Sequence, residues 1–271
     1  MKIGLHILAL LLVASIQGIA QESKYQDPEP PFPYASEEVS YKNESDGISL
    51  AGTLTYPKEK GPHPAVILIS GSGPQDRNSE LLGHRPFLVI SDYLTRNGIA
   101  VLRTDDRGAG ESGGNHNASG LAEFTSDALA AVDYLKSRSE INSSKIGLIG
   151  HSLGGIIGPM TAAENSDIAY LILLAGPGMK GHELMLLQKE IIERQMGIDD
   201  LSIAIGQKNI GGAYDIILSA KMDSDSLNTQ LEAYFKQIYG MALTEEQLSA
   251  TAEQLSFPWF TDFVKSTPIA C

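Results

Sequence analysis

The stretch that most restricts the fold of this chain is Lys-Ile-Gly-Leu-Ile-Gly-His-Ser-Leu-Gly-Gly at residues 145–155. Its apolar run predicts a buried strand, and the small, apolar residues that follow predict a helix. In a sharp turn between such elements, a serine adopts a strained backbone conformation with its Oγ exposed above the sheet. Glycines are needed on both sides, because a Cβ there would collide with the neighbouring strand or helix. Ser152 is therefore the candidate nucleophile, and the alternative is a G-x-S-x-G that occurs by chance in a loop.

Strand and helix patterns alternate before and after this turn. Runs that predict strands lie at residues 37–41, 48–56, 64–69, 99–102 and 168–174. Helical spacing of apolar residues is found at residues 86–96 and from an N-cap at Thr125 or Ser126 to about Ser137. The first two strands flank a polar turn and predict an antiparallel hairpin, while the later alternation predicts a mostly parallel sheet with helices on both faces. We expect this α/β core to cover residues 37–176.

The pattern changes after residue 176, because helical stripes then follow one another without intervening strands. They lie at residues 182–196 and 227–238, and Thr244 and Gln247 form a capping box before a further helix. We expect residues 177–262 to form a helical cap over the carboxyl ends of the strands, where a lid would lie. The alternative is that these helices simply extend the core.

Three motifs together resemble those of the α/β-hydrolase superfamily, and more narrowly those of secreted bacterial carboxylesterases close to the serine-aminopeptidase-like branch. They are Ser-Gly-Ser-Gly-Pro-Gln-Asp-Arg at residues 70–77, Asp-Asp-Arg-Gly-Ala-Gly-Glu-Ser at residues 105–112 and Gly-His-Ser-Leu-Gly-Gly at residues 150–155. The resemblance covers about residues 37–271 in the order of elements. It implies an α/β-hydrolase fold with a helical cap insertion.

The resemblance also implies roles in acyl transfer, which requires a nucleophile, a base, a group that orients the base and donors for the oxyanion. It places the oxyanion donors at the backbone N–H groups of Ser72 and Leu153. An ordinary Gly-rich turn is the alternative for residues 70–77. In residues 105–112 we expect the Asp and Arg side chains to hold the loop by hydrogen bonds and ion pairs rather than to touch substrate.

The base and its orienting acid are not found in the order that this fold uses, which is serine, then Asp or Glu, then His. The only histidine after Ser152 is His182, which has no strand before it. We therefore expect that the chain is C-terminally truncated, that residues 263–271 begin the rest of the core, and that the catalytic Asp and His lie beyond Cys271. Such a fragment would be a poor catalyst, because triad members act as a unit.

The function expected from these features is that of a serine hydrolase that cleaves small-molecule carboxylic esters through an acyl-enzyme on Ser152. The alternatives are a peptidase or thioesterase of the same fold, or a non-catalytic binding protein with this fold. No H-E-x-x-H motif or cysteine cluster predicts a metal site, and Gly71-Ser72-Gly73 lacks the third glycine of a dinucleotide fingerprint, so we expect neither metal nor cofactor.

Charge and the N-terminal residues restrict partners and location. The net charge of −13 and the pI of about 4.8 argue against nucleic acid and anionic membranes as partners, and they indicate no particular oligomeric state.

Residues 1–20 predict a cleaved signal peptide, with an uncleaved membrane anchor as the alternative, and residues 21–36 predict a Pro-rich linker. We therefore expect a secreted or periplasmic protein without stable membrane insertion after cleavage.

Overall fold

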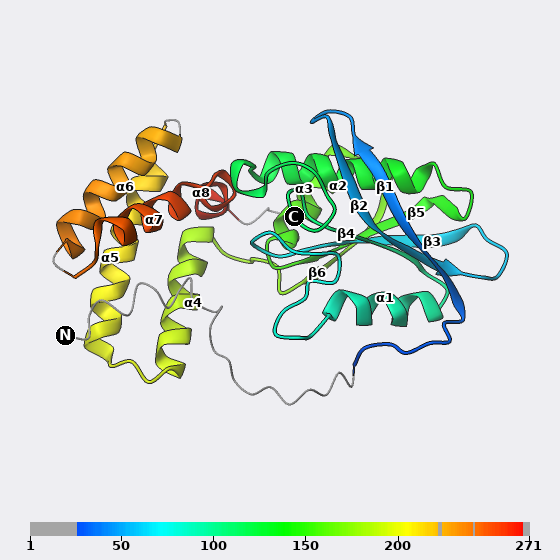
Figure 1. The fold of residues 1–271 in the computed structure, drawn as a ribbon, viewed down its shortest axis with the longest axis horizontal. Helices are drawn as coiled ribbons and strands as arrows, with labels where there is room; N and C mark the ends of the chain where they lie inside the picture. The colour runs from blue at the N-terminus through cyan, green and yellow to red at the C-terminus, as the bar shows by residue number, and fades with distance from the viewer. Residues whose placement is uncertain (1–25, 222–223, 241, 268–271) are drawn as a thin grey trace. The chain divides into compact units, whose positions relative to one another are not determined.

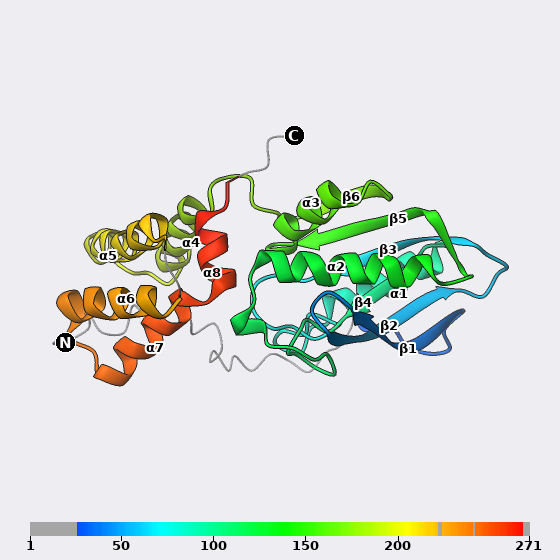
Figure 2. The same ribbon diagram turned by 90° about the horizontal axis from the view of Figure 1, so that it is seen from above.

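The computed structural model describes residues 26–221, 224–240 and 242–267 of the chain. The predicted signal peptide, residues 1–20, lies outside this part. The described chain forms two compact units that divide between Pro177 and Gly178 (Figures 1 and 2). Residues 26–177 are called the sheet unit and the described residues from 178 onward the helical unit, and each is described by itself.

The sheet unit contains a mixed sheet whose described strands follow the order β1-β2-β4-β3-β5-β6. These strands are β1 (Tyr34–Asn43), β2 (Ile48–Pro57), β3 (His63–Ile69), β4 (Ala100–Thr104), β5 (Ile141–His151) and β6 (Ile168–Leu174). The pairs β1–β2 and β2–β4 are antiparallel, and the remaining pairs are parallel. The predicted N-terminal hairpin and mostly parallel sheet are confirmed, with β1 beginning inside the segment that we predicted as a linker.

Helices cover both faces of this sheet. They are α1 (Pro86–Arg96), α2 (Leu121–Lys136) and α3 (Gly154–Glu164), with a short 3-10 helix, η3 (His116–Ala118), before α2. Figure 1 shows α1 on one face of the sheet and α2 and α3 on the other. Successive side chains of a strand point to opposite faces, so Val66 and Leu68 of β3 pack with Phe87 of α1, while Ala65 and Ile67 join the core that includes α2. This two-sided burial explains the continuous apolar run of β3.

The predicted start of α2 at Thr125 or Ser126 is wrong, because the helix begins at Leu121 with Gly120 as its N-cap. The Glu123 carboxylate accepts a hydrogen bond from the Gly120 N–H at 2.7 Å, which satisfies a free donor at the helix start. Thr125 lies inside the helix, where its Oγ1 donates to the Leu121 carbonyl at 2.7 Å. The hydrogen bond between the Glu123 carboxylate and the Gly120 N–H thus replaces the expected Ser or Thr cap.

The helical unit, in its described part, consists of helices that share one apolar core. They are α4 (Gly181–Gln195), α5 (Asp200–Ser219), α6 (Ser224–Tyr239), α7 (Glu245–Ser256) and α8 (Pro258–Lys265). Buried Tyr214, Phe235 and Leu248 belong to this core. The predicted capping box of α7 is confirmed, since Gln247 N–H donates to Thr244 Oγ1 at 3.2 Å and Thr244 N–H donates to Gln247 Oε1 at 3.0 Å.

Helices α5 and α8 were not predicted from the sequence. Three glycines inside α5 lower its helix propensity, but a Cβ at Gly212 would lie 2.1 Å from Tyr234 Oη, so packing requires the glycine there. Helix α8 runs through the predicted boundary between residues 262 and 263, and its Val264 is fully buried in the helical core. In the described ranges no helix has both the length and the hydrophobicity that spanning a bilayer requires.

Candidate active site

The turn that contains Ser152 joins β5, which ends at His151, to α3, which begins at Gly154. Ser152 has a φ of +52°, in the left-handed region that non-glycine residues rarely adopt. Its N–H donates to the Leu174 carbonyl of β6 at 3.0 Å, and its own carbonyl accepts from the Gly155 N–H at 2.8 Å. These bonds to a neighbouring strand and to the helix start hold a strained conformation, which is characteristic of functional sites.

Glycines surround Ser152 because the backbone segments there are in close contact. A Cβ at Gly150 would lie 2.0 Å from the Gly154 carbonyl oxygen, and one at Gly154 would lie 2.5 Å from the Ile69 carbonyl oxygen. Both distances are far shorter than a van der Waals contact, so a side chain at either position would displace backbone. The sequence-based explanation for these glycines is confirmed.

The segment that follows β3, residues 70–75 and here called the β3 loop, lies beside the serine turn. The Gly154 N–H donates to the Ser70 carbonyl at 2.9 Å. A Cβ at Gly71 would lie 3.3 Å from both Ser152 Cβ and His151 Nδ1. Strand β3 has β4 on one side and β5 on the other, so this loop lies where the strand order reverses, which is the usual ligand position in open α/β sheets.

The backbone N–H groups of Ser72 and Leu153 form no hydrogen bond with any acceptor in the described part of the chain. Ser72 belongs to the β3 loop, and Leu153 directly follows the candidate nucleophile, with its side chain buried. Both N–H groups thus belong to segments that meet at Ser152, and neither is used by an acceptor in the described residues.

The segment after β4, residues 105–112 and here called the β4 loop, is held by two arginines. Arg77 forms a bidentate pair with Asp105, with Nε–Oδ1 and Nη2–Oδ2 distances of 3.0 and 2.6 Å. Arg107 pairs with Asp127 of α2 in the same way at 2.6 and 2.8 Å, and with Asp46 in the turn between β1 and β2. As the sequence predicted, these Asp and Arg side chains tie the loop to its neighbours by ion pairs.

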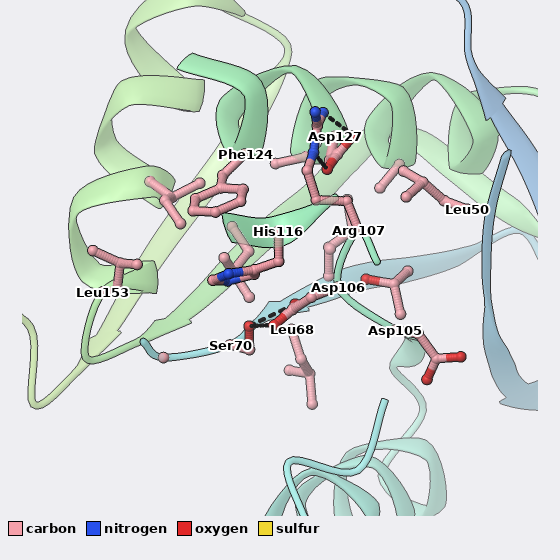
Figure 3. A pocket seen from close by; sticks show the side chains of 17 residues that line it. Leu50, Leu68, Ser70, Asp105, Asp106, Arg107, His116, Phe124, Asp127 and Leu153 are labelled. Carbon is pink, nitrogen blue, oxygen red and sulfur yellow. Dashed lines mark hydrogen bonds and ion pairs between the residues drawn. The ribbon is translucent and has the colours of Figure 1, made fainter. Parts of the chain in front are cut away.

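Asp106 has a different environment from the residues on either side of it. Its carboxylate contacts Ser70 Oγ and lines a cavity of about 50 Å³, with Gly71, His116 and Leu153 among the other lining residues. Figure 3 shows Asp106 pointing toward Ser70, whereas Asp105 points away from it. The pKa of Asp106 is raised to about 7, chiefly by burial. The hydrogen bond that Ser70 donates acts in the opposite direction and lowers this pKa. The sequence does not separate Asp106 from Asp105, because adjacent carboxylates carry no signal of which one pairs with an arginine and which one lies beside Ser70.

The histidines of the sheet unit form no catalytic pair with Ser152. Within the described residues of this unit no hydrogen bond joins Ser152 Oγ to a histidine ring. His151 is exposed beside the β3 loop, and His116 is buried against Phe124, where burial lowers its pKa. His182 belongs to α4 of the helical unit and lies 3.9 Å from the Glu183 carboxylate. Among the described residues there is also no cluster of His, Cys, Asp and Glu that could hold a metal ion.

Comparison with known proteins agrees with this architecture. Residues 86–261 match the family model described as serine aminopeptidase, S33. The esterase EstD of Thermotoga maritima is 33% identical over a region that covers 61% of this chain and 39% of EstD. A Bacillus subtilis protein named as a hydrolase is 36% identical over a region that covers 41% of this chain and 42% of that protein. The chain thus spans about two fifths of the length of each of these relatives.

Two solved structures resemble parts of the chain with TM-scores below 0.5. The Pyrococcus furiosus esterase Pf2001 superimposes with a TM-score of 0.47 and 22% identity, over 66% of this chain and 63% of that one. The Butyrivibrio proteoclasticus protein Est1E, solved with bound ferulic acid, superimposes with a TM-score of 0.43 and 30% identity, over 51% and 52% of the two chains.

Proposed function

Because the chain belongs to the serine aminopeptidase (S33) family of α/β hydrolases, we propose that it cleaves carboxylic esters through an acyl-enzyme on Ser152. The observation that carries this proposal is the left-handed backbone of Ser152 at the junction of β5 and α3. At a strand-to-helix turn of this kind, the strained backbone exposes the serine hydroxyl above the sheet. The similarity to a protein named as an esterase supports an ester as the substrate.

In the proposed reaction, Ser152 Oγ attacks the carbonyl carbon of the ester and loses its proton to a base. The carbonyl oxygen becomes negatively charged and accepts hydrogen bonds from the free N–H groups of Ser72 and Leu153. The carbon–oxygen bond to the alcohol then breaks, and the alcohol leaves with the proton. Water hydrolyses the acyl-enzyme to release the acid and restore the hydroxyl. The base and the acid that orients it are not assigned to any described residue.

Peptide bond cleavage is the second candidate, because the matching family model is described as an aminopeptidase. The same nucleophile and oxyanion donors would serve an amide, and the difference lies in the leaving group, which must be protonated as it departs. A thioester would be cleaved by the same groups. A non-catalytic binding protein of this fold is the remaining alternative.

The test compares the full-length gene product, which includes any residues encoded beyond Cys271, with its Ser152→Ala variant on a series of p-nitrophenyl esters and on aminoacyl p-nitroanilides. We expect ester turnover that the substitution abolishes, and a preference for one acyl length. An exposed serine of the sheet unit supplies the matched control Ser139→Ala, since Ser139 precedes β5 and so lies at the end of this strand opposite to Ser152. Covalent labelling by a fluorophosphonate, located by mass spectrometry, is expected on the Ser152 peptide.

Several results would reject the proposal. Equal turnover by the protein and by Ser152→Ala would show that Ser152 is not the nucleophile. Faster cleavage of the anilides than of the esters would favour a peptidase. A folded protein that neither turns over substrate nor takes up the label would favour the binding protein.

A further inference from the structure

Asp106 holds both ends of the β3 loop. Ser70 Oγ lies 2.7 and 2.8 Å from its two carboxylate oxygens, and the Gln75 N–H donates to Oδ2 at 2.9 Å. The backbone repeats the link, since the Asp106 N–H donates to the Gln75 carbonyl at 3.0 Å. The residues between these two anchors therefore form a closed loop whose shape depends on one side chain.

The closed loop carries the candidate oxyanion donor Ser72. Gln75 Nε2 donates to the Ser72 carbonyl at 3.2 Å, which fixes the peptide unit on one side of that residue. On the other side, the Ser70 carbonyl accepts from the Gly154 N–H at 2.9 Å and so joins the loop to the serine turn. An oxyanion donor is effective only when it is held in place before the reaction, because a misplaced donor contributes little.

We propose that Asp106 is the positioning residue that holds the β3 loop with the Ser72 N–H beside Ser152. The effect on catalysis rests on the proposed function, whereas the effect on the loop does not. The Asp106 carboxyl accepts hydrogen bonds from Ser70 Oγ and from the Gln75 N–H, which lie at the two ends of the loop.

The surroundings of Asp106 make its ionised form unfavourable. Asp105 beside it and Asp127 of α2 are both acidic and raise its pKa further, after burial. The nearby cation Arg107 is already paired with Asp127 and Asp46, and Arg77 is paired with Asp105. His116 lines the same cavity, and burial lowers its pKa, which favours the uncharged ring. The carboxyl of Asp106, which is half-buried, thus faces no free cation among these neighbours, and its partners are Ser70 Oγ and the Gln75 N–H.

The substitution Asp106→Asn separates charge from shape, because an asparagine amide has the shape of the carboxyl group without its charge. Its Nδ2 can donate to Ser70 Oγ and its Oδ1 can accept from the Gln75 N–H, at any pH. Asp106→Ala removes both anchors. Asp133→Asn is the matched control, because Asp133 is exposed on α2.

The test is amide hydrogen exchange of peptides that cover residues 70–77, compared among these proteins at pH 5.5 and pH 8.5. At both values we expect equal protection in the wild type and the control, and similar protection in Asp106→Asn, which can keep both anchors. Asp106→Ala is expected to exchange about tenfold faster in this segment, because the loop opens more often when both anchors are lost. Full protection of Asp106→Ala, or exchange of Asp106→Asn as fast as that of Asp106→Ala, would overturn the positioning role.

An activity measurement then links the loop to the reaction. With p-nitrophenyl acetate, Asp106→Ala is expected to lower kcat by about 10-fold to 100-fold with KM changed less than about threefold, and Asp106→Asn is expected to recover most of the loss. Unchanged kcat in Asp106→Ala would show that the loop does not serve catalysis. If Ser152→Ala keeps full esterase activity, the proposed function fails, and the exchange comparison still decides whether Asp106 holds the loop.

Discussion

The pH dependence of stability should reveal Asp106 directly, through a comparison of the wild type with Asp106→Asn. The pKa of Asp106 is raised from 3.8 to about 7 in the folded protein, so the folded state binds a proton that the unfolded state releases between these values. The free energy of unfolding therefore falls as pH rises through this window and becomes constant above about pH 7, whereas an asparagine shows no such fall. The neutral variant should gain stability relative to the wild type on going from pH 5 to pH 8.

The size of the gain follows from the pH interval over which Asp106 is charged only in the unfolded chain. From pH 5 to about 7 the interval is about two units, and at about 1.4 kcal/mol per unit the upper limit is about 3 kcal/mol. The cavity of about 50 Å³ that Asp106 lines has room for water, which would solvate part of the charge. We therefore expect a relative gain of about 1 to 3 kcal/mol.

Urea unfolding at pH 5 and pH 8, followed by far-UV circular dichroism, measures this difference. The chain has one tryptophan, Trp259, which lies in α8, so its fluorescence reports the helical unit and separates that transition from unfolding of the sheet unit. The control Asp133→Asn should follow the wild type at both values. A difference between Asp106→Asn and the wild type that is the same at pH 5 and pH 8, or that shrinks at pH 8, would refute the assignment of a raised pKa to Asp106.

Three further substitutions test other parts of the structure. Ser152→Gly should be about 1 kcal/mol more stable than Ser152→Ala, because only glycine adopts a positive φ without strain, and equal urea midpoints would contradict the backbone assigned to this turn. Arg107→Met should lower the free energy of unfolding by about 3 to 5 kcal/mol because it leaves Asp127 without its cation, while Arg194→Met, at an exposed pair, should leave the curve unchanged. Thr244→Ala removes the N-cap of α7 and should cost about 1 kcal/mol, read from the tryptophan fluorescence, and no change would mean that the capping box does not stabilise the helix.

Local patterns were sufficient to predict most of the elements and the position of the candidate nucleophile. The run before Ser152, the glycines around it and the helix after it are neighbours in the chain, so their geometry can be inferred from residue types alone. The N-terminal hairpin, β3 and α1 were predicted for the same reason, since periodicity and turn residues act over a few positions.

Elements that depend on packing were not predictable in this way. Helix α5 contains glycines that weaken its propensity, and only contact with Tyr234 explains the one at Gly212. The start of α2 was predicted too late in the chain. Thr125 and Ser126 are residue types that commonly form N-caps, whereas the hydrogen bond from the Gly120 N–H to the Glu123 carboxylate is seen only in the structure. Propensity is a weak guide where tertiary contacts supply the stabilisation.

The sequence by itself determined that a serine is presented at a turn between a buried strand and a helix, because the residue types that specify this turn are consecutive in the chain. Tertiary structure alone decided which of two adjacent aspartates pairs with an arginine and which one holds the β3 loop. Asp105 pairs with Arg77, while Asp106 reaches Ser70, which is 36 positions away in the chain. Hydrogen-bond partners and the degree of burial arise only when the loops after β3, β4 and β5 meet at one edge of the sheet, and these two quantities set the charge on a carboxyl group.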